Sequence, residues 1–115
     1  MTRDDLADLR SNFADCEMLQ LVDVAARTVL ISDSISRLGQ EHHDALCAQA
    51  AALFAPGAAD SPGCALLASP TGTRVFVASQ LDATEVLCGV FAPGADLSMV
   101  EEATRAVFAR RESEG

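Results

Sequence analysis

The chain has 115 residues, of which 50 % are hydrophobic and 22 % are charged, and this balance is that of a folded domain rather than of a disordered segment. Asp and Glu outnumber Lys and Arg by 17 to 8, so the formal charge is −9, which disfavours nucleic acid and anionic membrane as partners. The length predicts a single domain over residues 1–115.

The N-terminus is acidic and lacks the apolar region of a signal peptide. The longest apolar run is too short to span a bilayer. We therefore expect a cytoplasmic protein that binds neither a membrane nor nucleic acid.

The first predicted element is a helix at about residues 3–16. Thr2 and Asp5 have the spacing of a capping box, in which each side chain bonds the backbone of the other residue. Apolar residues then recur at helical spacing: Leu6, Leu9, Phe13 and Cys16.

Two short apolar strands follow, at residues 18–24 and 29–35, and the loop 25–28 between them predicts a hairpin. The second strand alternates in polarity, so alternate residues are expected to share one face of the sheet. On one side these are Val29, Ile31, Asp33 and Ile35.

The most informative segment is 45–55, which has one polar side chain in eleven residues. It belongs to a predicted helix over residues 41–55, whose large residues Leu46, Leu53 and Phe54 share the side that suits a sheet. The opposite side is lined by alanine, where an ordinary surface helix would be polar. A chain of this size cannot easily cover both sides of such a helix, so we expect a second copy of the chain to cover it.

The remaining part of the chain predicts three strands and a helix. The strands are expected at residues 64–69, 74–80 and 86–92, and the last is apolar without alternation, as is typical of a central strand covered on both faces. The helix at 97–111 begins with a second predicted capping box, formed by Ser98 and Glu101. Its inward residues are predicted to be Leu97, Val100, Thr104, Val107 and Phe108.

In this order of elements the chain resembles a Roadblock/LC7 domain. The match is carried by the strand Val86–Phe91 and its short turn, Ala92–Leu97, onto the last helix, by the hairpin Cys64–Gln80, and by the alanine-rich second helix. The resemblance implies an α+β fold with a five-stranded antiparallel sheet in the order 2-1-5-4-3. The second helix would lie on one face and the two terminal helices on the other. The first hairpin, Ala25–Thr28, departs from the family because it lacks the expected Asp-Gly turn.

The resemblance also implies that the chain pairs with itself through the second helix and the third strand. Family members act as scaffolds or regulators, often of small Ras-like GTPases. The predicted interface residues are Ala45, Ala48, Ala51, Ala52, Ala55, Cys64 and Leu66.

A metal site is suggested only by the cluster Glu41-His42-His43-Asp44 with Cys47, where His43 and Cys47 are four residues apart on a helix. Further ligands are missing nearby, and the acids suit a solvated first helical turn. Cys47 beside His43 is also the best candidate for a thiol nucleophile, although packing in the core is the better interpretation. The segment Ser69–Thr73 lacks the lysine of a phosphate loop and is interpreted as a hairpin turn.

We therefore predict no catalytic residue, no cofactor and no metal. The four cysteines have no paired spacing, so four free and mostly buried thiols are expected. The leading hypothesis is a non-enzymatic homodimeric scaffold or regulatory module that binds a protein such as a small GTPase. The alternative is a small-molecule sensor of PAS or GAF type, which the absence of Trp and Tyr disfavours because ligand pockets usually have aromatic walls.

Overall fold

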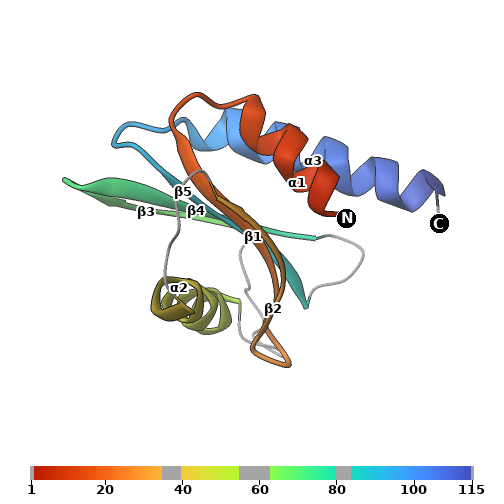
Figure 1. Ribbon diagram of the computed structural model, residues 1–115, viewed down its shortest axis with the longest axis horizontal. Coiled ribbons are helices and arrows are strands. Elements are labelled where there is room, and N and C mark those ends of the chain that lie inside the picture. Colours follow the sequence, from red (N-terminus) through yellow and green to blue (C-terminus); the bar gives the residue numbers. More distant parts are fainter. Residues whose placement is uncertain (1, 35–39, 55–62, 80–83, 115) are drawn as a thin grey trace.

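The computed structural model contains an antiparallel five-stranded sheet in the order β2-β1-β5-β4-β3, with helices on both faces (Figure 1). The structure describes residues 2–34, 40–54, 63–79 and 84–114. Over these residues the helices are α1 (Arg3–Ser11), α2 (Gln40–Leu53) and α3 (Leu97–Glu114). The strands are β1 (Cys16–Asp23), β2 (Thr28–Ser34), β3 (Cys64–Ser69), β4 (Gly72–Ala78) and β5 (Glu85–Phe91). The α+β fold and the strand order that the resemblance implies are confirmed.

Two helices, α1 and α3, lie side by side on one face of the sheet, and α2 lies on the other (Figure 1). Each face has its own apolar cluster. The cluster under α1 and α3 is centred on Leu6, Leu9, Leu19, Val75, Val77, Leu87 and Phe91. The cluster under α2 is centred on Met18, Val22, Leu46, Ala50, Phe54, Phe76, Val86 and Cys88. Because residues of β5 belong to both clusters, the prediction that this strand is central and covered on both faces is confirmed.

Helix α1 is shorter than predicted, because it ends at Ser11 rather than at residue 16. The predicted capping box is present: the Thr2 hydroxyl accepts from the Asp5 backbone N–H at 3.2 Å, and the Asp5 carboxylate accepts from the Thr2 N–H at 2.8 Å. Beyond the C-cap the chain turns, and the N–H of Cys16 bonds the carbonyl of Phe13. Both residues still belong to the cluster under α1. Their apolar spacing therefore reflects burial in the same core and does not indicate a longer helix.

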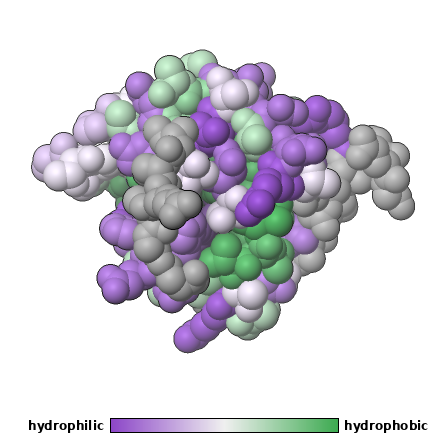
Figure 2. Space-filling view, viewed as in Figure 1, coloured by the Kyte–Doolittle hydropathy of each residue, from purple (hydrophilic) through white to green (hydrophobic). Residues whose placement is uncertain are grey.

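The predicted alternation along β2 is wrong for Val29. Leu21 pairs with Ile31 and Val22 with Val29, so Leu30 is an extra residue in a β-bulge. Val29 therefore packs on the α2 side, and Ile31 packs on the other. The side chain of Leu30 is 46 % exposed, and Figure 2 shows an apolar patch around this edge of the sheet. Ile35 lies outside the described residues.

The start of α3 also differs from the prediction. The carboxylate of Asp96 accepts from the backbone N–H of Ser98 at 2.9 Å, so Asp96 caps the helix and Ser98 lies inside it. The cause is that the helix begins at Leu97, and Asp96 stands immediately before it. The predicted inward side of α3 is confirmed, with Val100, Thr104 and Val107 all buried.

Candidate interaction surface

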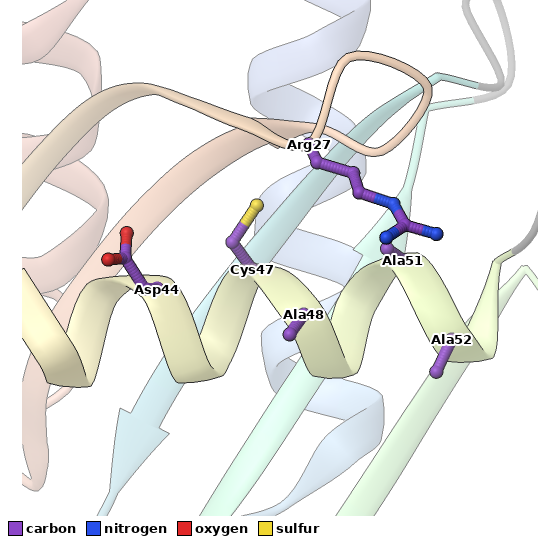
Figure 3. Close-up of a pocket in the computed structure, with 6 residues that line it drawn as sticks. All are labelled: Arg27, Asp44, Cys47, Ala48, Ala51 and Ala52. Atoms are coloured by element: carbon purple, nitrogen blue, oxygen red, sulfur yellow. The ribbon is translucent and has the colours of Figure 1, made fainter.

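The outer side of α2 carries small apolar residues at the molecular surface. Ala45, Ala48 and Ala52 are exposed and Ala51 is half-buried, and we call these four residues the alanine face. In Figure 3, Ala48 and Ala52 point away from the sheet. The helix therefore leaves a flat apolar strip uncovered, as the sequence predicts.

The inner side of α2 holds the helix firmly on the sheet. Leu46, Ala50 and Phe54 are buried in the cluster under α2, and the rings of Phe54 and Phe76 lie 6.5 Å apart. Because these side chains fix the helix, the alanine face has a defined position relative to the strands.

Polar contacts anchor the beginning of α2. The side chain of Gln20 is fully buried, and its Nε2 donates to the carbonyl of His43 at 3.1 Å. Its Oε1 then accepts from the Nδ1–H of His43 at 2.7 Å. The ring of His43 thus serves the packing of α2, and one turn further along, Cys47 is buried against the sheet.

A hollow of about 410 Å³ lies between α2 and the turn that joins β1 to β2. It is lined by Arg27, Asp44, Cys47, Ala48, Ala51 and Ala52. Arg27 reaches from the turn along the helix, and its guanidinium lies next to Ala51 (Figure 3). This residue has φ 54°, a left-handed conformation that glycine adopts freely and arginine rarely. Arg27 is not among the residues predicted from the sequence. The absence of an Asp-Gly pair from this hairpin was the signal that another residue had to adopt the left-handed conformation of the turn.

The strand part of the predicted interface lies on β3, at one edge of the sheet. The side chains of Cys64 and Leu66 pack against the cluster under α1 and α3, and so they lie on the opposite face from α2. Ala65 packs on the α2 side, and Leu67, two residues further along the same face of the strand, is 39 % exposed. That Cys64 and Leu66 belong to an interface stays a prediction. In such an interface they would take part through the backbone at the edge of β3. Ala55 lies outside the described residues.

The thiols are placed for packing rather than for nucleophilic chemistry. Burial raises the pKa of Cys16 to about 12 and also raises the pKa of Cys88 and Cys47. Burial likewise raises the pKa of Cys64, whose thiol donates to the carboxylate of Glu101. All four thiols are free. A raised pKa keeps a thiol protonated at neutral pH, and the thiolate is the reactive form.

In the described part of the chain, no three His, Cys, Asp or Glu side chains are gathered as a metal site would need. The candidate cluster around His43 and Cys47 is not gathered in this way among these residues. A hollow of about 230 Å³ at the start of α3 is lined in part by Phe13 and Phe91, whose rings stack edge to face at 5.8 Å. It is smaller than a typical ligand pocket, which measures roughly 300–1,000 Å³. None of the described helices has both the length and the apolar character needed to cross a membrane.

Comparison with solved structures identifies the fold family of the chain. No protein-family model matches the sequence, and no curated protein matches it either. Among solved structures, a Roadblock/LC7 domain from Streptomyces avermitilis matches with a TM-score of 0.78 and 10 % identity, over 98 % of this chain and 96 % of that chain. MglB from Myxococcus xanthus matches with a TM-score of 0.72 and 12 % identity, over 96 % of this chain and 91 % of its own.

MglC from Myxococcus xanthus has a TM-score of 0.70 and 8 % identity, and the match covers 98 % of both chains. A further structure of MglB, described as having a tetrameric arrangement, matches with a TM-score of 0.70 and 15 % identity, over 93 % of this chain and 82 % of its own. The PAS or GAF alternative is not favoured by these matches. At such identities the likeness concerns the fold, and the chain has the Roadblock/LC7 fold.

Proposed function

We propose that this chain is a non-enzymatic homodimeric module that binds a regulatory protein partner, a small Ras-like GTPase. The observation that carries the proposal is the alanine face, which α2 exposes on one face of a sheet whose edge strand is β3. A rigid apolar strip at the surface and an unpaired sheet edge are both features that a second copy of the chain can cover.

The physical argument for a dimer is one of area and shape. Small side chains such as Ala48 and Ala52 let a second helix approach closely. The edge of β3 offers backbone groups for pairing across the same two-fold axis. A stable interface buries roughly 1,200–2,000 Å² in total, which one helix face and one strand edge per copy can supply together.

The class of partner rests on the resemblance to Roadblock/LC7 domains and on the common fold with MglB and MglC. The solved MglB with a tetrameric arrangement supports self-association as a property of this fold. The charge of −9 favours a partner with a basic surface. The protonated, mostly buried thiols and the lack of a gathered metal-ligand cluster among the described residues favour a role without catalysis.

The homodimer is tested by the substitution Ala52→Glu, which places a charge on the alanine face. The matched control is Ala106→Glu, because Ala106 is an exposed helical alanine on α3, on the other side of the sheet. Light scattering at micromolar concentration should give a dimer mass for the wild type and the control, and a monomer mass for Ala52→Glu. A monomeric wild type would contradict the proposal, and a dimeric, equally stable Ala52→Glu would assign the interface to another face.

The partner is tested by affinity capture from native cytoplasm with either a GTP analogue or GDP present. We expect a Ras-like GTPase whose retention depends on the nucleotide, and whose binding weakens as salt rises from low to moderate concentration. Captured proteins that include no GTPase would contradict the assigned class of partner. Nucleotide hydrolysis by the isolated chain, abolished by one point mutation in it, would contradict the non-enzymatic role.

A further inference from the structure

The hollow of about 230 Å³ lies where the turn from α1 into β1 meets the turn from β5 into α3. The two turns are joined by the backbone N–H of Ala92, which donates to the carbonyl of Asp15 at 2.9 Å. They lie at the same end of the sheet, on the side of α1 and α3 (Figure 1). None of the described residues that line the hollow belongs to α2 or β3, so it is separate from the surface of the proposed dimer.

One side of this hollow is an apolar wall. The rings of Phe13 and Phe91 stack edge to face there, and Val100 is buried beside them. The side chain of Met99 is 59 % exposed, more than any other large apolar side chain in the described residues. Because a methionine side chain is flexible and polarizable, it can adapt to a group that another molecule presents.

The charged residues that line the hollow, within the described part of the chain, are two acids, Asp15 and Asp96. Both are exposed, and neither takes part in an ion pair with a described residue. One carboxylate oxygen of Asp96 caps α3 by accepting from the N–H of Ser98 at 2.9 Å and of Met99 at 3.4 Å. The other oxygen is not used by these bonds, so each acid has acceptor capacity left for a cation.

We propose that this hollow binds an arginine side chain of a partner protein. The stem and the planar guanidinium would lie against Phe13 and Met99, and the guanidinium would donate to Asp15 and Asp96. Arginine combines the two properties that the hollow requires, because its guanidinium stacks on aromatic rings and bonds carboxylates with paired donors. The inference rests on the proposed function only in assuming a protein partner, and it adds a contact away from α2.

Other occupants fit the hollow less well. Phosphate or an acidic side chain would be repelled by the two carboxylates. A purely apolar side chain would shield these carboxylates from water without pairing them, which is unfavourable. Lysine supplies the charge but has no planar group to stack on the rings. A second copy of the chain carries the same charge of −9, and its docking here would be head-to-tail, which does not close into a dimer.

The test uses the full chain, labelled with ¹³C at the methionine methyl groups, and the blocked peptide acetyl-Gly-Arg-Gly-amide as the probe. We expect the methyl signal of Met99 to shift and to saturate with a dissociation constant on the order of millimolar. Met18 is 1 % exposed and lies in the cluster under α2, so its signal should stay in place. The same peptide with citrulline, which has nearly the same shape but no charge, should bind about threefold more weakly or worse.

The double variant Asp15→Asn with Asp96→Asn removes both charges and keeps the shape of the side chains. Asparagine is also a good N-cap, so α3 should still begin at the same place. We expect the dissociation constant for the arginine peptide to rise about fivefold or more. The matched control is Asp4→Asn with Glu41→Gln, which removes two exposed acids outside the hollow and should change the constant by less than about twofold.

The outcomes separate the arginine site from the proposed function. A Met99 signal that does not move at about 20 mM peptide would overturn the site. Equal affinity for the citrulline peptide, or an equal loss in the control variant, would overturn it as well. A Met99 signal that shifts with protein concentration alone would assign the hollow to a second copy. None of these results would affect the homodimer or the class of partner, which the light scattering and the affinity capture test independently.

Discussion

The two faces of the sheet are covered to different extents. On one face α1 and α3 lie side by side and enclose the cluster around Leu19 and Phe91 (Figure 1). On the other face α2 lies alone, with a buried inner side and an outer side of exposed alanines. The chain itself covers the first face, whereas the second leaves apolar side chains of α2 exposed. Both faces therefore contribute to folding stability, and the exposed alanines support the proposal that association uses the α2 face.

The polar contacts of the helices follow the same division. Arg105 of α3 reaches the carbonyls of Gly63 and Ala78, both at 3.4 Å, and it pairs with Glu101 at 3.0 Å. Arg10 of α1 pairs with Asp33 of β2. These arginines tie their helices to the ends and edge of the sheet. Arg27 instead extends from the β1–β2 turn along the surface of α2 and lines the hollow there.

The largest expected effect tests whether the inner side of α2 belongs to the folding core. Phe76 is fully buried and contacts Phe54. We expect Phe76→Ala to lower the free energy of unfolding by about 3–5 kcal/mol, because it removes apolar contacts and leaves a cavity. Leu6→Ala, on the face under α1 and α3, should cost about 2–5 kcal/mol. Equilibrium denaturation at one protein concentration compares the two, and a loss below about 1 kcal/mol for Phe76→Ala would mean that α2 adds little to the core.

An intermediate effect tests how tightly the other face is packed. A Cβ at Gly89 would lie 2.6 Å from Cε1 of Phe91 and 3.0 Å from Cδ2 of Leu19. We expect Gly89→Ala to lower the free energy of unfolding by about 1–3 kcal/mol through overpacking. The double variant with Phe91→Leu should lose less than the sum of the two single variants, because the shorter side chain makes room. Additive losses would show that the ring of Phe91 does not cause the strain.

The smallest effect concerns the cap of α1. Thr2→Ala should lower the free energy of unfolding by about 1 kcal/mol at pH 7. Ser98→Ala, at the position where the sequence wrongly predicts a cap, should change it by less than about 0.5 kcal/mol. Thermal unfolding of both variants provides the comparison, and an equal loss for Ser98→Ala would contradict the capping role of Asp96.

The cap should also depend on pH. The hydrogen bond from the backbone of Thr2 lowers the pKa of Asp5 below its usual 3.8. A carboxyl with a lowered pKa stabilises the fold above its unfolded pKa, and the contribution disappears as the pH falls through its folded pKa. The difference between wild type and Asp5→Ala, which removes the carboxylate that accepts this bond, should therefore be larger at pH 7 than at pH 2.

Much of this fold is predictable because its signals are local. The apolar spacing of α3, the bounds of β3 and the unbroken apolar run of β5 each depend on residues close together in the chain. The errors in the predicted elements arise where a bulge or a turn interrupts the periodicity of the apolar residues. The bulge at Leu30 moves Val29 to the other face, and the turn after Ser11 ends a helix whose apolar spacing continues to Cys16.

The candidate interaction surface likewise has one part that the sequence predicts and another that only the tertiary structure determines. The alanine face follows from the sequence alone, because a period of 3.6 residues puts Ala45, Ala48 and Ala52 on one side of any helix that contains them. Only the tertiary structure places Arg27 over that helix, because the position depends on the packing of the β1–β2 turn against a segment about twenty residues further along the chain. It likewise turns the side chains of Cys64 and Leu66 to the opposite face, since the pairing of β3 with β4 decides which residues of an edge strand face α2. Local periodicity determines what a helix presents, and long-range pairing determines what lies beside it.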